Sequence, residues 1–306
     1  TTMNRRKETQ AEPFLKWVGG KARRVNEILN LMPEQIDYYM EPFLGGGAVA
    51  LEVLRRNPDC KALLSDLNPH LINCWRQVKE NPQGVIRSVH ALDDRYLRLK
   101  FASEQKSFYM AVRERWNIYM AVLERCNESM DDEDSGGEAD RAGMFLWLNR
   151  NCFQGMWRVN SRGEFNVPSR QSRTRESRVN YEAIEQASAL LKNADIQQGG
   201  FDGFVMAPGT VVFVDPPYIR ENNGRGFTAY TKDGFTDADH LALAEKLRLS
   251  GATYVLTIGG DEDIVREIYG QPDSVSEIPC TFAATNAGRR TRNEFIITNN
   301  LHKKFK

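Results

Sequence analysis

The sequence predicts an α/β fold in which a doubly wound, Rossmann-like sheet is interrupted by a second, mostly helical domain. Over residues 36–66 a strand runs into a glycine turn and a helix, and a second strand then ends in an acid. The same alternation of strands and helices returns at 210–269, after a middle part that lacks it. We therefore expect residues 1–80 and 209–306 to form one domain and residues 81–208 to form the insert.

Hydrophobic patterns and turn residues predict the elements of the first half. They are a helix over 25–32, a strand over 36–40, a helix over 48–55, a strand over 62–66 and a helix from residue 69. Asn68 and Pro69 indicate where the last of these begins, because asparagine caps helices and proline suits their first position.

The second half of the sheet is expected from a comparable pattern. Its elements are a strand over 210–214, a helix over 236–250, a strand over 252–258, a helix over 261–269 and a strand over 294–298. Thr236 and Asp239 fit a variant of the capping box, in which both side chains bond backbone amides at the start of a helix.

The insert is predicted to be helical to about Arg125 and then changes character. Residues 127–140 carry seven acids and no base, whereas residues 141–178 carry eight arginines and only two acids. Long runs of like charge are usually solvated, and we expect the acidic stretch to be a loop. The arginine-rich stretch is a candidate surface for an acidic partner.

Composition narrows the possible functions. The 41 basic and 41 acidic residues cancel, which by itself argues mildly against a nucleic-acid binder. Five widely spaced cysteines and four histidines give no pattern of metal ligands or disulfides, so no metal and a reducing cytosol are expected. No signal peptide or membrane-spanning run is evident, and no membrane partner is expected.

A cofactor site is predicted where the first strand ends. Gly45-Gly46-Gly47, and Gly45 and Gly47 in particular, allow a ligand to approach the backbone where a Cβ would collide. Asp66, about twenty residues on at the end of the next strand, suits the two hydroxyls of a ribose. The alternative for Asp66 is a helix cap, and the turn could also serve a nicotinamide or flavin nucleotide.

S-adenosylmethionine (SAM) is the cofactor favoured by the combination of residues here. The turn lacks a phosphate-binding Gly-x-Gly-x-x-Gly pattern, and SAM has no phosphate. Its cationic sulfonium suits nearby carboxylates and aromatic faces, which Trp17, Glu41, Phe43 and Asp66 would provide. For Trp17 and Phe43, core packing is the competing interpretation.

Asp215-Pro216-Pro217-Tyr218 directly follows the strand over 210–214 and is the predicted chemical site. Methylation of an exocyclic amine requires acceptors for its two hydrogens, since its lone pair is delocalised into the ring. The Asp215 carboxylate and the Pro216 carbonyl would serve, and Tyr218 offers a face on which a base can stack. The alternative is a rigid surface turn.

These motifs resemble those of the Dam-type DNA adenine methyltransferases, the alpha class of amino methyltransferases. The resemblance covers about 14–301 and rests on five motifs in a characteristic order, namely Lys16–Lys21, Glu41–Gly47, Leu148–Arg150, Arg162–Pro168 and Asp215–Tyr218. It implies a SAM-dependent methyltransferase sheet with an inserted target-recognition domain. It also implies that Trp17, Lys21, Asp66 and Asp215 contact SAM.

The resemblance further implies double-stranded DNA as partner, a bacterial or phage-infected cytoplasm and a monomer. The candidate DNA-binding residues are Arg150, Phe153, Gln154, Met156, Arg158, Asn160, Arg162, Pro168, Arg170 and Arg173. Dam enzymes that recognise GATC commonly have Tyr, Asn and Leu where this chain has Phe153, Gln154 and Met156, so GATC is a first guess. For Phe153 and Met156, packing in the hydrophobic core is the alternative to a DNA contact.

Other functions stay open at this point. The nearest alternatives are methylation of RNA adenine, of cytosine or of a protein glutamine. Asp215 favours adenine, because cytosine and glutamine enzymes usually carry Ser or Asn at this position. A catalytically silent DNA-binding homologue would dispense with Asp215, Tyr218 and Asp66, which are present here.

Overall fold

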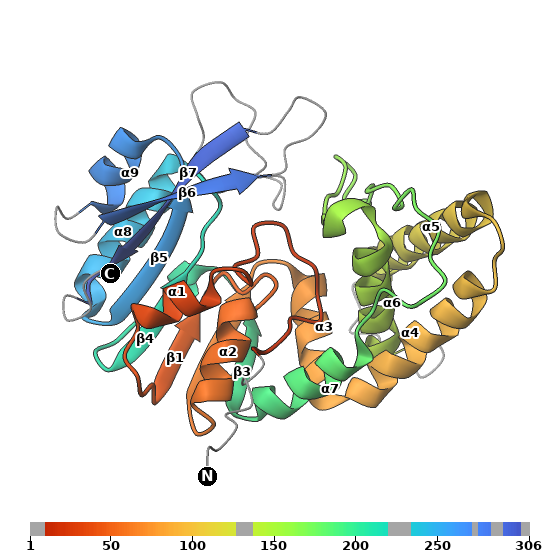
Figure 1. Ribbon diagram of the computed structural model, residues 1–306, viewed down its shortest axis with the longest axis horizontal. Coiled ribbons are helices and arrows are strands. Elements are labelled where there is room, and N and C mark those ends of the chain that lie inside the picture. The colour runs from red at the N-terminus through yellow and green to blue at the C-terminus, as the bar shows by residue number, and fades with distance from the viewer. Residues whose placement is uncertain (1–9, 127–136, 220–233, 271–274, 283–289, 301–306) are drawn as a thin grey trace, which may run out of the picture.

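The computed structural model describes residues 10–126, 137–219, 234–270, 275–282 and 290–300. Within them the chain forms a seven-stranded sheet in the order β3-β2-β1-β4-β5-β7-β6. Figure 1 shows the sheet at one side of the molecule and a group of helices at the other. The predicted fold class, an α/β protein with a Rossmann-like sheet, is confirmed.

Five of the seven strands are parallel, so their carboxyl ends meet at one edge of the sheet. The strands are β1 (Tyr38–Glu41), β2 (Lys61–Asp66), β3 (Ala194–Gln198), β4 (Thr210–Val214), β5 (Thr253–Gly259), β6 (Val275–Phe282) and β7 (Arg290–Thr298). The last two run antiparallel, β7 to β5 and β6 to β7. In open α/β sheets, ligands bind outside the carboxyl ends of the parallel strands.

Helices cover both faces of the sheet, because successive side chains along each central strand point to opposite faces. Val211 and Phe213 share a buried cluster with residues of α1 (Val25–Asn30), α2 (Ala48–Arg56) and α3 (Pro69–Glu80). Val212 and Val214 instead join residues of α8 (Asp237–Ser250) and α9 (Glu262–Tyr269) on the other face. Strands buried on both faces explain the nearly continuous apolar runs in the sequence.

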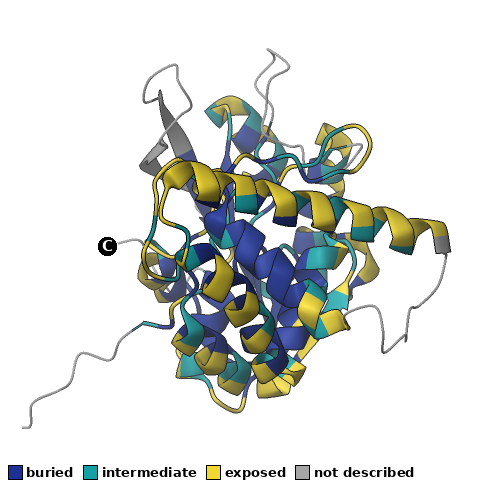
Figure 2. Cartoon of the chain, turned by 90° about the vertical axis from the view of Figure 1, so that its right-hand side faces the viewer, coloured by how far each residue is buried: buried dark blue, intermediate teal, exposed yellow. Residues whose placement is uncertain are grey.

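The helical part packs around one buried helix, α6 (Glu138–Asn151), whose residues 142–149 are all buried. It packs against α3, α4 and α5, and Figure 2 shows the outer helices with exposed faces around a buried centre. The remaining elements are α4 (Pro82–Leu97), α5 (Ala102–Cys126), α7 (Tyr181–Leu190) and the short 3-10 helices η1 (Phe153–Gly155), η2 (Leu191–Asn193) and η3 (Phe201–Gly203). A helix apolar all round belongs in a core.

Two predicted helix starts are confirmed. The Asn68 side chain accepts from the amides of His70 and Leu71, and Pro69 is the first residue of α3. Thr236 and Asp239 form a complete capping box at the start of α8. These local signals depend on neighbouring residues alone, which is why the sequence shows them.

Three features differ from the expectations. β3 lies within 81–208 but pairs in parallel with β2, so the chain rejoins the sheet before residue 209. The division into domains stays a prediction, with its second boundary better placed before Ala194. Of the acidic stretch, residues 127–136 lie outside the described residues, whereas Glu138 and Asp140 belong to the first turn of α6 rather than to a loop. β6 had no expected counterpart.

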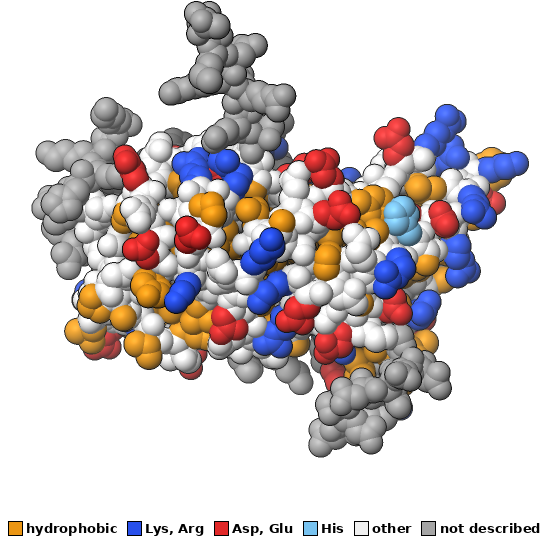
Figure 3. Space-filling model, turned by 90° about the horizontal axis from the view of Figure 1, so that it is seen from below, with side chains coloured by type: hydrophobic (Ala, Val, Ile, Leu, Met, Phe, Trp, Pro, Cys, Tyr) orange, Lys and Arg blue, Asp and Glu red, His pale blue; other side chains and the backbone are white. Residues whose placement is uncertain are grey.

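The charged side chains on one face of the molecule agree with the neutral net charge of the chain. On the face shown in Figure 3, acidic and basic side chains are interspersed rather than gathered by sign. A broad basic surface of the kind that binds nucleic acid non-specifically is not visible on that face.

Candidate active site at the carboxyl edge of the sheet

The glycine turn after β1 is packed against two indole rings. Gly45 and Gly47 have φ angles of +47° and +62°, which side chains rarely adopt. A Cβ on Gly45 would lie 2.8 Å from the Trp17 ring, and one on Gly47 would lie 2.5 Å from the Trp75 ring. The glycines therefore let Trp17 and Trp75 approach the backbone of the turn, and Trp17 lies directly over it.

Asp66, at the end of β2, is bonded to this turn. One carboxylate oxygen accepts from the Gly45 amide at 3.0 Å and the other from the Asn68 amide at 3.0 Å. Burial raises the pKa of Asp66, and these amide donors act in the opposite direction. The helix cap is provided by Asn68, so capping does not account for Asp66. Each carboxylate oxygen keeps acceptor capacity for a ligand hydroxyl.

Phe43 belongs to an aromatic group beside the same edge. Its ring stacks on Phe201 of η3, with centroids 6.0 Å apart, and meets Phe235 edge-on at 5.7 Å. Phe201 and Phe235 were not among the predicted site residues. Phe201 follows β3, a strand that the sequence patterns did not indicate, and for that reason its place beside Phe43 could not be foreseen.

Asp215 follows β4 and is held at both carboxylate oxygens. Lys21 Nζ lies 2.7 Å from one oxygen, and the hydroxyl of Thr257 on β5 donates to the other at 2.8 Å. Burial raises the pKa of Asp215, although Lys21 opposes that shift. The side chain stays 20% exposed, so a ligand can still reach it.

Tyr218 lies next to Asp215 and is held against β5. A Cβ on Gly259 would lie 2.7 Å from the Tyr218 ring, so only glycine allows this contact. The Tyr218 hydroxyl donates to Glu294 on β7 at 2.9 Å. Thr257 and Glu294 were missed by sequence reasoning. The available signal was a lone acid opening the apolar stretch 294–298.

Glu41 is buried beneath this edge and is 2% exposed. It bonds the Tyr39 hydroxyl at 2.5 Å, and burial raises its pKa to about 8. Burial thus favours the neutral form of Glu41, whereas its carboxylate was expected from the sequence. A nearby cation would favour its ionised form.

The segment over 150–173 leaves α6 and is fastened to the rest of the protein by backbone contacts. Buried Asn149 accepts from the Lys16 amide at 3.0 Å and donates to the carbonyl oxygens of Lys16 and Gly155. Asn117 of α5 bonds both backbone groups of Phe165. The segment thus has a fixed base beside the Lys16–Lys21 motif.

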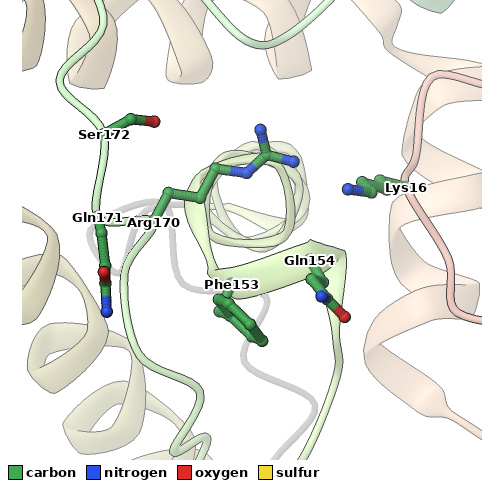
Figure 4. A pocket seen from close by; sticks show the side chains of 6 residues that line it. All are labelled: Lys16, Phe153, Gln154, Arg170, Gln171 and Ser172. Atoms are coloured by element: carbon green, nitrogen blue, oxygen red, sulfur yellow. The ribbon is translucent and has the colours of Figure 1, made fainter. Parts of the chain in front are cut away.

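A hollow of about 320 Å³ lies on this segment and faces the N-terminal part of the chain (Figure 4). Its lining residues are Lys16, Phe153, Gln154, Arg170, Gln171 and Ser172. Gln154 has a φ of 56°, a strained value for a side chain other than asparagine or glycine. Phe153 is 39% exposed, so core packing does not explain it. Pro168 lines an adjoining hollow together with Arg170.

The remaining predicted DNA contacts differ in how they are held. Exposed Arg158 donates to the Asn166 side chain at 2.7 Å, whereas Arg162 pairs with Glu164 at 2.8 Å. Met156 packs against the main core, which supports the packing interpretation for this residue. Three others are bonded within the protein. Asn160 bonds Glu164 inside the segment, whereas Arg150 and Arg173 donate to the carbonyl oxygens of Arg178 and Leu99 outside it.

The described part of the chain was also searched for other kinds of site. It contains no group of three or more His, Cys, Asp or Glu side chains that could hold a metal ion. Its helices include none that is long and apolar enough to cross a membrane.

A parallel sheet with the glycine turn after β1 and the Asp-Pro-Pro-Tyr turn after β4 defines an α/β methyltransferase. The chain belongs to the D12 class of N6 adenine-specific DNA methyltransferases, whose family model matches residues 17–278. The suspected Dam-type family is thereby confirmed, and so is the enzyme class. Membership also implies a methyl donor and a DNA substrate.

Named relatives agree with this assignment. The type II methyltransferase M.MjaIII of Methanocaldococcus jannaschii is 35% identical over 85% of this chain and 88% of its own length. The type II methyltransferase M1.LlaDCHI of Lactococcus lactis subsp. cremoris is 31% identical over 94% of this chain and 95% of its own. A DNA adenine methylase of Haemophilus influenzae is 32% identical over 84% and 82%.

Proposed function

We propose that this protein transfers the methyl group of SAM to the exocyclic amino nitrogen of an adenine turned out of duplex DNA at a specific sequence. The supporting observation is the Asp215 carboxylate, which is fixed at the carboxyl end of β4 yet remains partly exposed. One of its oxygens and the Pro216 carbonyl would accept the two amino hydrogens. Tyr218 would stack on the base.

The residues around the turn fit SAM. Asp66 would accept from the ribose hydroxyls, and Phe43 with Phe201 would flank the adenine ring of the cofactor. Trp17 and the ionised form of Glu41 would stabilise the cationic sulfur. When bound, SAM supplies a methyl group on sulfur, so that the N–C bond forms as the S–C bond breaks and one amino proton is released.

The segment over 150–173 would read the DNA. Exposed Arg158 can bond a guanine edge in bidentate fashion, and Asn166 holds it for that purpose. Phe153 can fill the stack that an extruded base leaves. Gln154 is strained at φ 56°, a feature often found where the backbone serves a ligand. Lys16 and Arg170 would meet phosphate or base edges at the hollow between them.

GATC remains the proposed target sequence. It rests on the resemblance to Dam-type enzymes, and it is challenged by Phe153, Gln154 and Met156 at positions where GATC enzymes commonly differ. We also propose the cytoplasm of a bacterial or phage-infected bacterial cell as the setting, since similar proteins come from Lactococcus lactis and from Escherichia phage P1. A monomeric state remains a prediction.

Methylation with labelled SAM tests the proposal. Unmethylated duplex DNA, RNA and a glutamine-containing peptide are offered in parallel, and modified bases in the DNA are then located by sequencing. We expect N6-methyladenine at one short sequence in duplex DNA alone. Label in RNA or peptide only, or in cytosine, would reject the proposal, and DNA binding without any transfer would indicate a silent homologue.

A further inference from the structure

Glu294 of β7 receives three donors from two separate parts of the chain, the N-terminal stretch and the turn after β4. It is 2% exposed and lies opposite Gly259 of β5. Its Oε1 accepts from the Tyr218 hydroxyl at 2.9 Å and lies 3.2 Å from Lys21 Nζ, while its Oε2 accepts from the Arg24 guanidinium. So many bonds to one buried carboxylate fix its position.

Lys21 links Glu294 to Asp215. Its ammonium has three hydrogens, and three acceptors surround it: the Gly19 carbonyl at 2.8 Å, Asp215 at 2.7 Å and Glu294 at 3.2 Å. In this arrangement all of its donors are engaged within the protein. Lys21 is therefore placed as a bridge between two carboxylates, although the resemblance implies a contact with SAM.

We propose that Glu294 is a positioning residue: it anchors Tyr218 directly and, through Lys21, fixes the direction in which the Asp215 carboxylate faces the target amine. The proposal rests on the proposed function of Asp215 and Tyr218. Thr257 fixes the second Asp215 oxygen and Gly259 fixes the Tyr218 ring, so Glu294 completes the restraint on both groups. Small displacements of such groups reduce rates strongly.

The charges of this cluster also depend on Glu294. Lys21 and Arg24 carry two positive charges, which pair with Asp215 and Glu294 inside the cluster and, for Arg24, also with the more exposed Glu27. Burial alone would lower the pKa of Lys21, but the two carboxylates outweigh burial and raise it. Burial and, to a smaller extent, Glu294 raise the pKa of Asp215. Without the Glu294 charge, both pKa values should fall.

Glu294→Gln tests the role, because it keeps the size of the side chain and removes its charge. The turnover rate kcat is measured with labelled SAM and unmethylated plasmid DNA over the widest pH range in which the protein stays folded, extending above pH 10.5 because the pKa of Lys21 is raised from that value. The SAM dissociation constant is measured by calorimetry. We expect kcat to fall about 10- to 100-fold while SAM affinity changes little. Both limbs of the kcat profile should move to lower pH. Glu41, the other titrating group near Asp215 and Lys21, is unchanged in the comparison.

Glu52→Gln is the matched control. Glu52 is 1% exposed and pairs with Arg55 and Arg56 on α2, away from the sheet edge. Losing this carboxylate should lower stability but leave kcat and its pH profile unchanged. Glu294→Asp keeps the charge and should retain the limbs of the parent profile, which also provides a folded variant if Glu294→Gln unfolds.

The outcomes separate the two proposals. Failure of the unaltered protein to methylate DNA would reject the proposed function itself. If the unaltered protein is active and Glu294→Gln has the same kcat and the same pH profile as the unaltered protein, the positioning role is wrong. A change confined to SAM affinity would also overturn it, because that would make Glu294 part of the cofactor site. If Glu294→Gln unfolds, displaced limbs in Glu294→Asp would overturn it as well.

Discussion

The sheet edge around Asp215 and the segment over 150–173 both carry charged side chains, but they differ in burial and in pairing. At the sheet edge, charged groups are buried and bonded to one another, as Lys21 is to Asp215 and Glu294. On the segment, Arg158 is exposed, and Arg170, like Lys16 across the hollow, has no acidic partner among the described side chains, although Arg162 pairs with Glu164. Groups that perform chemistry are fixed before the substrate arrives, whereas groups that read a polyanion keep their charge available.

The largest effect is expected at the buried site. Asp215→Ala removes the acceptor for the target amine and should lower the methylation rate by about 10³-fold or more. DNA affinity, measured by fluorescence anisotropy with a labelled duplex, should stay close to that of the parent. Asp195→Ala, at an exposed carboxylate on β3, is the control. Undiminished methylation by Asp215→Ala would remove the distinction between the two regions.

The next largest effect is expected at Asn149, which joins the N-terminal motif to the segment over 150–173. Asn149→Ala leaves the buried backbone groups of Lys16 and Gly155 without their partners, which should lower the free energy of unfolding by about 2–4 kcal/mol. Urea denaturation provides the measurement. Asn73→Ala, which removes a more exposed side-chain bond to Glu138, should cost much less. Equal losses for the two variants would show that the regions are not joined at Asn149.

A smaller effect is expected where DNA sequence is read. Arg158→Ala should cost about 1–3 kcal/mol of binding on the preferred site and relax the choice of sequence there. Arg248→Ala, at an exposed arginine on α8 outside the segment over 150–173, provides the control. Competition binding with duplexes changed one base pair at a time measures both. A loss that is the same on every sequence would make Arg158 a phosphate contact.

The smallest effect concerns the cations at the hollow. Arg170→Gln should reduce the slope of log K against log salt by about 1, with a similar loss of affinity on every sequence. Arg266→Gln, in an ion pair with Glu262 on α9, should leave the slope unchanged. Binding isotherms from 50 to 300 mM salt give the slopes. An unchanged slope for Arg170→Gln would mean that this cation does not meet a phosphate.

The sequence predicted what depends on near neighbours. The caps at Asn68 and Thr236, the glycine turn and the strand over 210–214 agree with the structure, because each is specified within a few residues. β3 was missed because Ala194–Gln198 is short and polar. It lies at the edge of the sheet, where short strands with polar side chains are common. Its pairing with β2 joins residues about 130 positions apart.

The site divides in the same way. Asp66 and Asp215 were placed from the strands that precede them, and the structure puts both at the carboxyl edge. Thr257 and Glu294 were missed because they act through partners on β4 and in the N-terminal motif, which no spacing within the sequence reveals.

Gly155 has a consequence for protein engineering. Its φ is +70°, and a Cβ there would lie 2.6 Å from Lys16 Cγ and 2.8 Å from the Lys16 carbonyl oxygen. A segment over 150–173 taken from a relative would therefore dock against Lys16 only if it brings glycine to this position, and only onto a chain that keeps Asn149 on α6. Chimeras that lack this contact should misfold, or should hold the segment over 150–173 in a different place relative to Asp215. We expect this whatever DNA sequence the new segment was selected to recognise.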